Sequence, residues 1–368
     1  MSMFAAIRAV ASYLPEKTEQ NDPANPIGKK VGIDERHVAA DDEAASDVAI
    51  RAAQNLFAAY DVQPTDIDFV LLCVQTPDYF MPTTACIVQE QLGIPQSAGA
   101  LDYSLACSAY PYGLAMAKGF IETGMAKNVL LLTTSVYERY INPKDGIIRP
   151  LFGDGGTATL VSAVESDHPM LDGFIFGSDG SRYDTMIIRA GGSRHMPHTT
   201  PVVYDEPDAR GNTRSNYEVF MDGKGMTSFT MHTVPPLVDD ILEKASLTRQ
   251  DLDGVVFHQA NHYMLEKLRT RCKLDDVPFY NEITHVGNLL GGSIPYALAT
   301  LAEEGRLTDR RHVLLAGFGV GLSWGGCVAD FGKLMEECVC ADGREKRDRT
   351  YASESVSAHR QSVKGRKY

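Results

Sequence analysis

The chain has 368 residues and a mass of 40.2 kDa, which is enough for one large domain or two of ordinary size. Apolar residues make up 44% and charged residues 23%, which is typical of a globular protein and excludes a disordered or collagen-like chain. The 48 acidic and 35 basic residues give a formal net charge of −13, which argues against nucleic acid as a partner because phosphate binding needs clustered positive charge.

The seven cysteines are scattered and form no CxxC pair, which indicates free thiols in a reducing compartment. The first residues lack a basic segment followed by a long apolar run, and no apolar stretch has the length that a bilayer requires. We therefore expect a cytoplasmic protein that does not associate with membranes. No cluster of side chains has a spacing typical of zinc ligands, so we expect no metal.

Two segments of the chain repeat one pattern. Residues 44–75 and 235–260 each begin with an amphipathic helical stretch and continue through an Asp-x-Asp turn into a short apolar run, at an offset of 185 residues. Residues 113–134 and 296–317 form a second similar pair, at an offset of about 181 to 184 residues. Any two strand–helix units look alike over ten residues. Here, however, two separate patterns repeat at nearly the same sequence separation, which favours a duplicated α/β unit.

This duplication predicts four regions. We expect a first half that carries a nucleophile, an irregular lid or insert, a second half that carries a histidine and an asparagine, and a basic, flexible tail: residues 1–175, 176–235, 236–340 and 341–368. The tail has eight Lys or Arg against four Asp or Glu. It is either a solvated terminus or a contact for an acidic carrier protein.

Cys107 has the setting of a reactive cysteine. A short strand pattern leads through small residues into an amphipathic helix, which places Cys107 near a helix N-terminus. Free backbone N–H groups and the helix dipole stabilise a thiolate there, so we expect a thiol pKa lowered towards 7 or below. The alternative is a buried structural cysteine.

The second half contains two polar residues at corresponding places. His258 follows an apolar run, at the strand edge where α/β sheets place ligands. Asn288 lies in a Gly-rich loop that corresponds to the Cys107 loop of the first half. A structural histidine and a turn asparagine are the alternatives. The symmetry predicts that Cys107, His258 and Asn288 meet at one site.

A glycine-rich run follows the last apolar strand pattern, over residues 317–326. Alternating glycines let the backbone approach a bound group closely and direct N–H donors at it. The run lacks the GK[ST] of a phosphate loop and the third glycine of a dinucleotide fingerprint. We therefore expect no nucleotide cofactor.

These motifs together resemble the β-ketoacyl-acyl-carrier-protein synthase III (KAS III) family of the thiolase superfamily. They occur in family order as ACS around Cys107, FGDGGTA over 152–158, HQAN over 258–261, GNLLGGSIP over 287–295 and GFGVGLSWG over 317–325. The resemblance implies a thiolase-like five-layered αβαβα fold made of two duplicated halves, a homodimer, and no cofactor besides acyl thioesters carried on acyl carrier protein or CoA.

The resemblance also implies the chemistry. Cys107 would take an acyl group from a thioester, and His258 and Asn288 would hold a malonyl-type thioester as it loses CO₂, giving a decarboxylative Claisen condensation. Backbone N–H groups of Cys107 and of the turn Gly319, Val320 and Gly321 would bind the oxyanion. The alternatives are an acyltransferase that acylates an alcohol or amine without decarboxylation, and a catalytically idle subunit.

The chain departs from the family pattern around the expected CoA site. Pro26 stands at the position of a CoA-gripping Trp, and Lys30 and Gly146 stand at the positions of two Arg residues. These changes predict a relative in specialised metabolism. Expected substrate-binding residues are located in several motifs: Lys30, Arg36, Tyr79, Phe80, Met81, Asn261 and Ser293.

Overall fold

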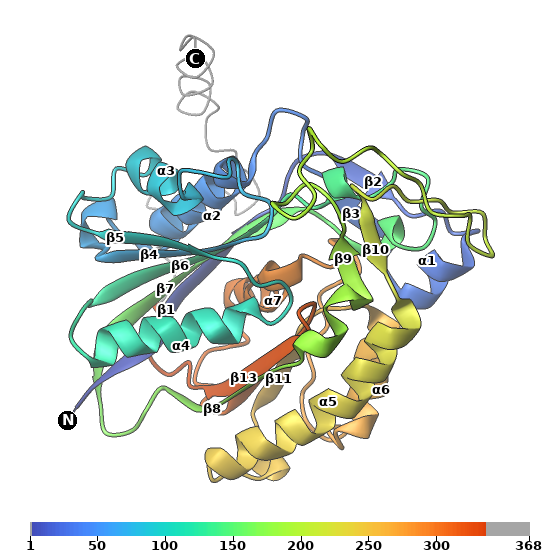
Figure 1. Ribbon diagram of the computed structural model, residues 1–368. Coiled ribbons are helices and arrows are strands. Elements are labelled where there is room, and N and C mark those ends of the chain that lie inside the picture. Colours follow the sequence, from blue (N-terminus) through green and yellow to red (C-terminus); the bar gives the residue numbers. More distant parts are fainter. Residues whose placement is uncertain (1, 336–368) are drawn as a thin grey trace.

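The computed structural model describes residues 2–335 (Figure 1). The basic tail expected over 341–368 lies outside the described residues. Two sheets form the framework of the molecule. Within residues 2–335, no helix combines the length and the apolar character that a membrane span needs.

The first sheet has five strands in the order β1-β7-β6-β4-β5. Strands β6, β4 and β5 are parallel, whereas β7 runs antiparallel to both β1 and β6. The strands have these bounds: β1 Ser2–Tyr13, β4 Phe69–Val74, β5 Gly99–Tyr103, β6 Asn128–Ser135 and β7 Gly155–Ser166. Strands β4 and β6 are buried along almost their whole length, which is why they read as continuous apolar runs.

The second sheet repeats this arrangement with four strands in the order β11-β12-β13-β8. Strands β11 and β12 are parallel, and β13 runs antiparallel to both neighbours, as β7 does in the first sheet. The strands have these bounds: β8 Leu171–Ser178, β11 Gly254–Phe257, β12 Val313–Gly319 and β13 Ser323–Ala329. A single parallel bridge between Val255 and Phe279 takes the place of β5.

The second aspartate of each Asp-x-Asp turn makes equivalent hydrogen bonds in the two halves. Asp68 accepts hydrogen bonds from the backbone N–H groups of Lys127 and Asn128, at 2.7 and 2.9 Å. Asp253 accepts from the backbone N–H groups of residues 311 and 312, at 2.9 and 3.0 Å. Each carboxylate thereby ties the start of one strand to the start of its parallel neighbour. The predicted duplication is confirmed.

The helices complete five layers. Helices α4 and α7 lie between the two sheets, α2 and α3 cover the outer face of the first sheet, and α5 and α6 cover the second (Figure 1). The central apolar core contains side chains from α4, α7 and both sheets. The helices have these bounds: α1 Pro26–Val31, α2 Ala45–Tyr60, α3 Thr84–Gln91, α4 Ala109–Glu122, α5 Gly223–Lys244, α6 His262–Arg271 and α7 Ser293–Glu303. The αβαβα prediction is confirmed.

Short elements border the site. Two small antiparallel ribbons are formed by β2 Thr18–Gln20 with β3 Glu35–His37, and by β9 Met186–Ile188 with β10 Val219–Met221. Single 3₁₀ turns occur at η1 Pro64–Asp66, η2 Glu138–Tyr140, η3 Arg149–Leu151, η4 Gly180–Thr185, η5 Arg249–Asp251 and η6 Leu290–Gly292.

The expected region boundaries need correction. Strand β8 crosses residue 175 and belongs to the second sheet, so the second half begins before the expected insert. Helix α5 begins at Gly223, within the expected irregular region, and not near Pro235. Glycine and threonine in its first turns weaken the helical pattern, whereas packing of Phe229 and Val234 in the core of the second half fixes the helix.

Candidate active site

Cys107 lies between β5 and α4, one residue before the helix N-cap Ser108. The sequence predicted this position, but the side chain is only 6% exposed, and burial raises its thiol pKa to about 12. Hydrogen bonds from the backbone of Cys107 and Val320 oppose this rise only in part. The expected lowering of the thiol pKa is therefore wrong, because the helix end is covered and dry.

The glycine-rich hairpin between β12 and β13 covers Cys107. A Cβ atom on Gly319 would lie 2.9 Å from Cys107 Sγ, and one on Gly317 would lie 2.7 Å from the Cys107 carbonyl oxygen. The hydroxyl of Ser108 forms a 2.7 Å hydrogen bond with that of Ser323, which fixes the two segments together. This close approach requires glycine, and it brings the backbone N–H of Val320 to the thiol.

His258 follows β11 at the carboxyl end of the strand. Its backbone N–H donates to the Ala316 carbonyl at 2.8 Å, and its ring meets the edge of Phe318 at a centroid distance of 5.6 Å. The side chain is 3% exposed, and burial lowers the imidazole pKa to about 3. The ring is therefore neutral at neutral pH. Its Nδ1 has no hydrogen-bond partner among residues 2–335.

Asn288 is fixed through both its backbone and its side chain. Its N–H donates to the Leu151 carbonyl at 2.8 Å, and its carbonyl accepts from the Gly153 N–H at 3.1 Å. Its Oδ1 accepts from the backbone N–H of Leu290 at 2.8 Å. The remaining amide nitrogen, Nδ2, lies 3.4 Å from Nε2 of His258. This arrangement leaves the donor end of the amide beside the imidazole.

The Cys107 loop and the Asn288 loop lie against each other. A Cβ atom on Gly291 would lie 3.1 Å from the Ala106 carbonyl oxygen and 3.0 Å from the Ala109 Cβ. Cys107 and Leu290 pack in the same apolar cluster. The structure thus places the Asn288 amide beside His258 and packs the loop that holds Asn288 against the loop that holds Cys107. That the three side chains form one catalytic site stays a prediction.

This geometry agrees with the comparisons to known proteins. The family models described as 3-oxoacyl-[acyl-carrier-protein] synthase III and its C-terminal part match residues 101–180 and 242–331. The β-ketoacyl-[acyl-carrier-protein] synthase III of Caldanaerobacter subterraneus subsp. tengcongensis is 34% identical over 337 residues, which cover 89% of this chain and 98% of that protein. This chain belongs to the KAS III family.

Solved structures extend the comparison. A crystal structure of a 3-oxoacyl-(acyl-carrier-protein) synthase III is 41% identical with a TM-score of 0.85, over 89% of this chain and all of the other. The priming β-ketosynthase of the R1128 polyketide pathway is 27% identical with a TM-score of 0.78, over 89% of this chain and 96% of the other. The protein is therefore a KAS III-like condensing enzyme with the thiolase fold.

Arg36 does not serve this KAS III chain as the expected substrate-binding residue. Its side chain is buried and makes an ion pair with Glu138, a 3.0 Å ion pair with Glu19, and hydrogen bonds to Asn21 and the Phe152 carbonyl. These contacts use its donors within the protein. The expectation is wrong because the guanidinium connects distant segments of the chain instead of facing a ligand.

Ser293 and Asn261 also have structural partners. The Ser293 hydroxyl is 1% exposed and donates to Oδ1 of Asn288 at 3.4 Å, so it supports Asn288 and is removed from solvent. Asn261 caps helix α6, and its Oδ1 accepts from the Met264 N–H at 2.8 Å. Its amide nitrogen stays available, and a role of Asn261 in substrate binding stays a prediction.

The remaining expected binding residues are exposed. The Lys30 ammonium lies 4.5 Å from the centroid of the Tyr263 ring, and Lys267 approaches the same ring at 5.6 Å. Tyr79, Phe80 and Met81 are 48%, 87% and 81% exposed, on the loop that follows β4. They project from the surface of this chain, so their expected role in substrate binding stays a prediction.

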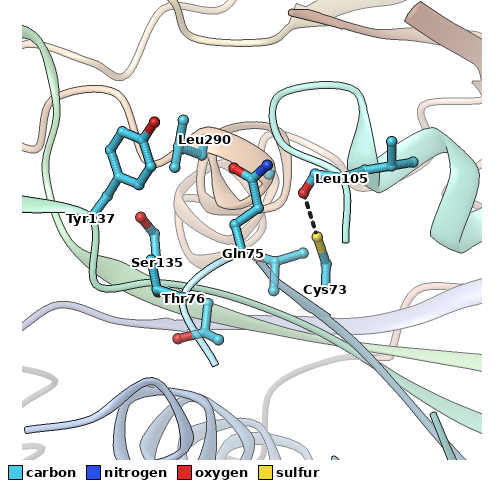
Figure 2. A pocket seen from close by; sticks show the side chains of 10 residues that line it. Cys73, Gln75, Thr76, Leu105, Ser135, Tyr137 and Leu290 are labelled. Carbon is cyan, nitrogen blue, oxygen red and sulfur yellow. Dashed lines mark hydrogen bonds between the residues drawn. The ribbon is translucent and has the colours of Figure 1, made fainter. Parts of the chain in front are cut away.

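Sequence reasoning missed a cavity beside the catalytic candidates (Figure 2). It is lined by residues of β4 and β6, of the segments that follow these strands, and of the loops that hold Cys107 and Asn288: Cys73, Gln75, Thr76, Leu105, Thr133, Thr134, Ser135, Tyr137, Leu290 and Gly291. Apart from Leu290 and Gly291, which belong to the GNLLGGSIP motif, these residues lie in none of the motifs described above. The sequence offers one signal: residue 75 follows β4 and residue 135 ends β6, and these two strands are parallel neighbours, so both residues lie at the same edge of the sheet.

Among residues 2–335, no group of three or more His, Cys, Asp or Glu could hold a metal ion.

Proposed function

We propose that this protein is an acyltransferase that catalyses a decarboxylative Claisen condensation through an acyl group on Cys107. Three observations support it: backbone N–H groups of Cys107 and Val320 at the thiol, the Asn288 amide 3.4 Å from a neutral His258 imidazole, and the contact between the Cys107 and Asn288 loops. His258 and Asn288 take the catalytic roles that the KAS III motifs imply. No cofactor takes part besides the acyl thioesters themselves.

Acyl transfer comes first. Because the Cys107 thiol is protonated at neutral pH, His258 accepts its proton as Sγ attacks the thioester carbonyl of the donor. The backbone N–H groups of Cys107 and Val320, held in place by Gly319 and Gly321, stabilise the resulting oxyanion. The carbonyl re-forms, the donor thiolate leaves, and it takes the proton from His258.

Condensation follows in the same pocket. The bond between the malonyl methylene carbon and its carboxylate breaks, CO₂ leaves, and the electron pair moves into an enolate of the thioester. Asn288 Nδ2 and His258 Nε2 donate hydrogen bonds to the enolate oxygen. The carbanion then attacks the acyl carbonyl and a C–C bond forms. The bond from that carbon to Cys107 Sγ breaks, the ketone carbonyl re-forms, and the Cys107 thiolate takes one proton from solvent to regain the resting thiol. One such donor contributes about 10²- to 10³-fold in rate.

Two further parts of the proposal concern the acyl donor and the oligomeric state of the protein. Acyl carrier protein or acyl-CoA would carry the acyl group, and Pro26, Lys30 and Gly146 favour a carrier bound differently from CoA in the primary-metabolism enzymes. The similarity to the R1128 priming ketosynthase supports a place in specialised metabolism. The exposed apolar loop 79–81 supports a homodimer, because apolar side chains of this exposure need a covering surface.

The test is to load Cys107 with acyl groups from carrier-protein and CoA donors and then add a malonyl thioester. We expect an acyl adduct by intact-mass spectrometry and then release of CO₂ with a β-keto product. An ester or amide product formed without CO₂ would favour the alternative acyltransferase. Absence of any adduct, or an adduct that persists in Cys107→Ala, would contradict the proposal.

A further inference from the structure

Two buried serine hydroxyls connect the nucleophile segment to the glycine-rich hairpin. Ser108 follows Cys107 directly and is 0% exposed, and Ser323 begins β13 and is 4% exposed. The two serines are 215 positions apart in the sequence, and their Oγ atoms lie 2.7 Å from each other. Because both side chains are removed from solvent, each hydroxyl needs its partner within the protein.

Ser108 stands at the N-cap of α4 but does not cap this helix. A serine at this position ordinarily has extended backbone geometry and accepts a hydrogen bond from a backbone N–H group of the first helical turn. The Ser108 side chain makes no such bond, and its backbone has φ and ψ of −88° and −4°. Its hydroxyl is therefore directed to the hairpin instead of to its own helix.

The hydrogen bonds of this pair have one direction. The Ser323 hydroxyl donates to the Val320 carbonyl at 3.0 Å. A serine hydroxyl carries a single proton and two lone pairs, so Ser323 accepts in its bond with Ser108. Ser108 therefore donates to Ser323, and Ser323 donates to Val320. These bonds lead from the residue after the nucleophile to the residue whose backbone N–H reaches the thiol.

The turn of the hairpin folds around the Ser323 side chain. A Cβ atom on Gly321 would lie 3.0 Å from Ser323 Oγ. The far side of the turn is held separately, because Leu322 exchanges two backbone hydrogen bonds with Asp179, at 3.0 and 2.8 Å. On the Val320 side, it is the Ser323 hydroxyl that binds the backbone of the turn.

We propose that Ser108 and Ser323 are positioning residues that hold the Val320 N–H at Cys107 and thereby raise the rate of acyl transfer. The inference rests on the proposed acylation of Cys107, in which this N–H binds the oxyanion. Ser323 acts through the Val320 carbonyl, and Ser108 acts through Ser323. An oxyanion donor contributes only when it lies within hydrogen-bond distance of the developing charge, so a small rotation of the backbone at Val320 lowers the rate.

The test compares two reactions of the same sulfur. Transfer of an acetyl group to Cys107 from acetyl-CoA, or from the acetyl thioester of N-acetylcysteamine, passes through an oxyanion, whereas alkylation by iodoacetamide is a direct displacement without one. Peptide mass spectrometry of the full-length protein follows both adducts. We expect Ser323→Ala to slow acetylation by about 10- to 100-fold and alkylation by less than about threefold. Ser108→Ala, which leaves the bond from Ser323 to Val320 in place, should slow acetylation by about three- to tenfold.

The order of the bonds gives a second expectation. Because Ser108 acts through Ser323, Ser108→Ala should have no further effect on acetylation in a protein that already carries Ser323→Ala. Ser108→Ala removes no helix cap bond, so it tests the proposal even where Ser323→Ala does not fold. Thr159→Val is the matched control, because it breaks the 3.2 Å bond between two other buried hydroxyls, those of Tyr110 and Thr159. It should keep the wild-type ratio of acetylation to alkylation.

Three results would contradict the inference and leave the proposed function intact. Equal slowing of acetylation and alkylation in Ser323→Ala and Ser108→Ala would show a change at the thiol or in the fold and not at the oxyanion. Wild-type acetylation in both single variants would show that the hydroxyls do not position Val320. Effects that multiply in the double variant would show that Ser108 does not act through Ser323. Absence of an acetyl adduct on Cys107 in the wild type with both donors would overturn the proposed function as well.

Discussion

Arg36 and Glu138 form an ion pair whose side chains are only 4% and 2% exposed, and this pair supports the segment that holds Asn288. Arg36 also donates to the Phe152 carbonyl at 3.2 Å, and its Cγ would lie 3.1 Å from a Cβ atom on Gly287. Phe152 pairs with Asn288 in a parallel bridge. The guanidinium therefore does not contact the Asn288 side chain. It supports the backbone at Gly287 and Phe152, which holds Asn288 in place.

Arg36→Gln should therefore destabilise the protein. It leaves Glu138 buried with Arg149 as its remaining cationic partner, and removing one partner of a buried ion pair costs about 3–5 kcal/mol. We expect the free energy of unfolding, measured by urea denaturation, to fall by about 3 kcal/mol. Arg189→Gln is the control, because its ion pair with Asp205 is 39% and 37% exposed and should contribute under about 1 kcal/mol. Similar losses in both variants would show that Arg36 has no special structural role.

Asn288→Ala should separate the two chemical steps. Asn288 Nδ2 lies beside the imidazole of His258 and belongs to the proposed enolate site, whereas the proposed oxyanion donors for acyl transfer are backbone N–H groups. We expect acylation of Cys107 to persist and CO₂ release from a malonyl thioester to fall by about 10²- to 10³-fold. Intact-mass spectrometry and CO₂ assays on the same sample check this. Equal losses in both assays would contradict the division of roles.

The approach of Asn288 to His258 and the contact between the Cys107 and Asn288 loops were predictable, because both follow from the repeat. An offset near 185 residues places strand ends of the two halves at equivalent edges, and the Asp68 and Asp253 turns fix the start of each strand pair. The positions of these strand ends can be read from local sequence patterns.

Helix α5, which contains two prolines, was predicted too short because its first turns depend on packing rather than on helix propensity.

The role of Arg36, the pKa of Cys107 and the polar cavity were not predictable in this way. Arg36 and Glu138 are 102 residues apart, and no local pattern links them. The thiol pKa depends on how closely the hairpin at Gly319 and the Leu290 loop exclude water, which only the packed structure specifies. Ser135 ends an apolar strand, where a small polar residue carries no distinctive signal.

The reactivity of Cys107 should report its raised pKa directly. With a thiol pKa of about 12, the thiolate fraction increases about tenfold for each pH unit through the whole range from pH 7 to 10. We expect the rate of Cys107 alkylation by iodoacetamide, followed by peptide mass spectrometry, to rise with that slope. The exposed Cys86 in the same sample monitors the reagent. A rate that levels off above pH 7 would instead support a thiolate stabilised by the helix end.

Gly319→Ala should disable the site without unfolding the protein. The new methyl group would lie 2.7 Å from the Cys107 Cβ and 2.9 Å from its Sγ, so the hairpin or the nucleophile has to move. We expect Cys107 acylation to slow by about 100-fold, because a displaced hairpin no longer presents the Val320 N–H correctly. Gly119→Ala on α4 is the control, since nothing lies within 4 Å of its Cβ position and alanine favours helix by about 0.5–1 kcal/mol. Wild-type rates in Gly319→Ala would exclude a role of the hairpin in binding the oxyanion.

His258 should make the protein sensitive to acid. Its pKa is about 3 in the folded chain against 6.5 without burial, so between these values the unfolded chain binds the extra proton and stability falls as the pH falls. At pH 5 this amounts to about 2 kcal/mol relative to pH 7. The variant His258→Gln should lose that part of the pH dependence in urea denaturation at the two pH values.

His168 is the opposite case, because hydrogen bonds to Asp330 and then Asp167 raise its pKa. Its contribution to the free energy of unfolding is therefore present at low pH and is lost as the pH rises. Removing it by His168→Gln should make the protein more acid-sensitive, and a shift in the same direction in both variants would contradict the assignment of a neutral, desolvated imidazole at His258.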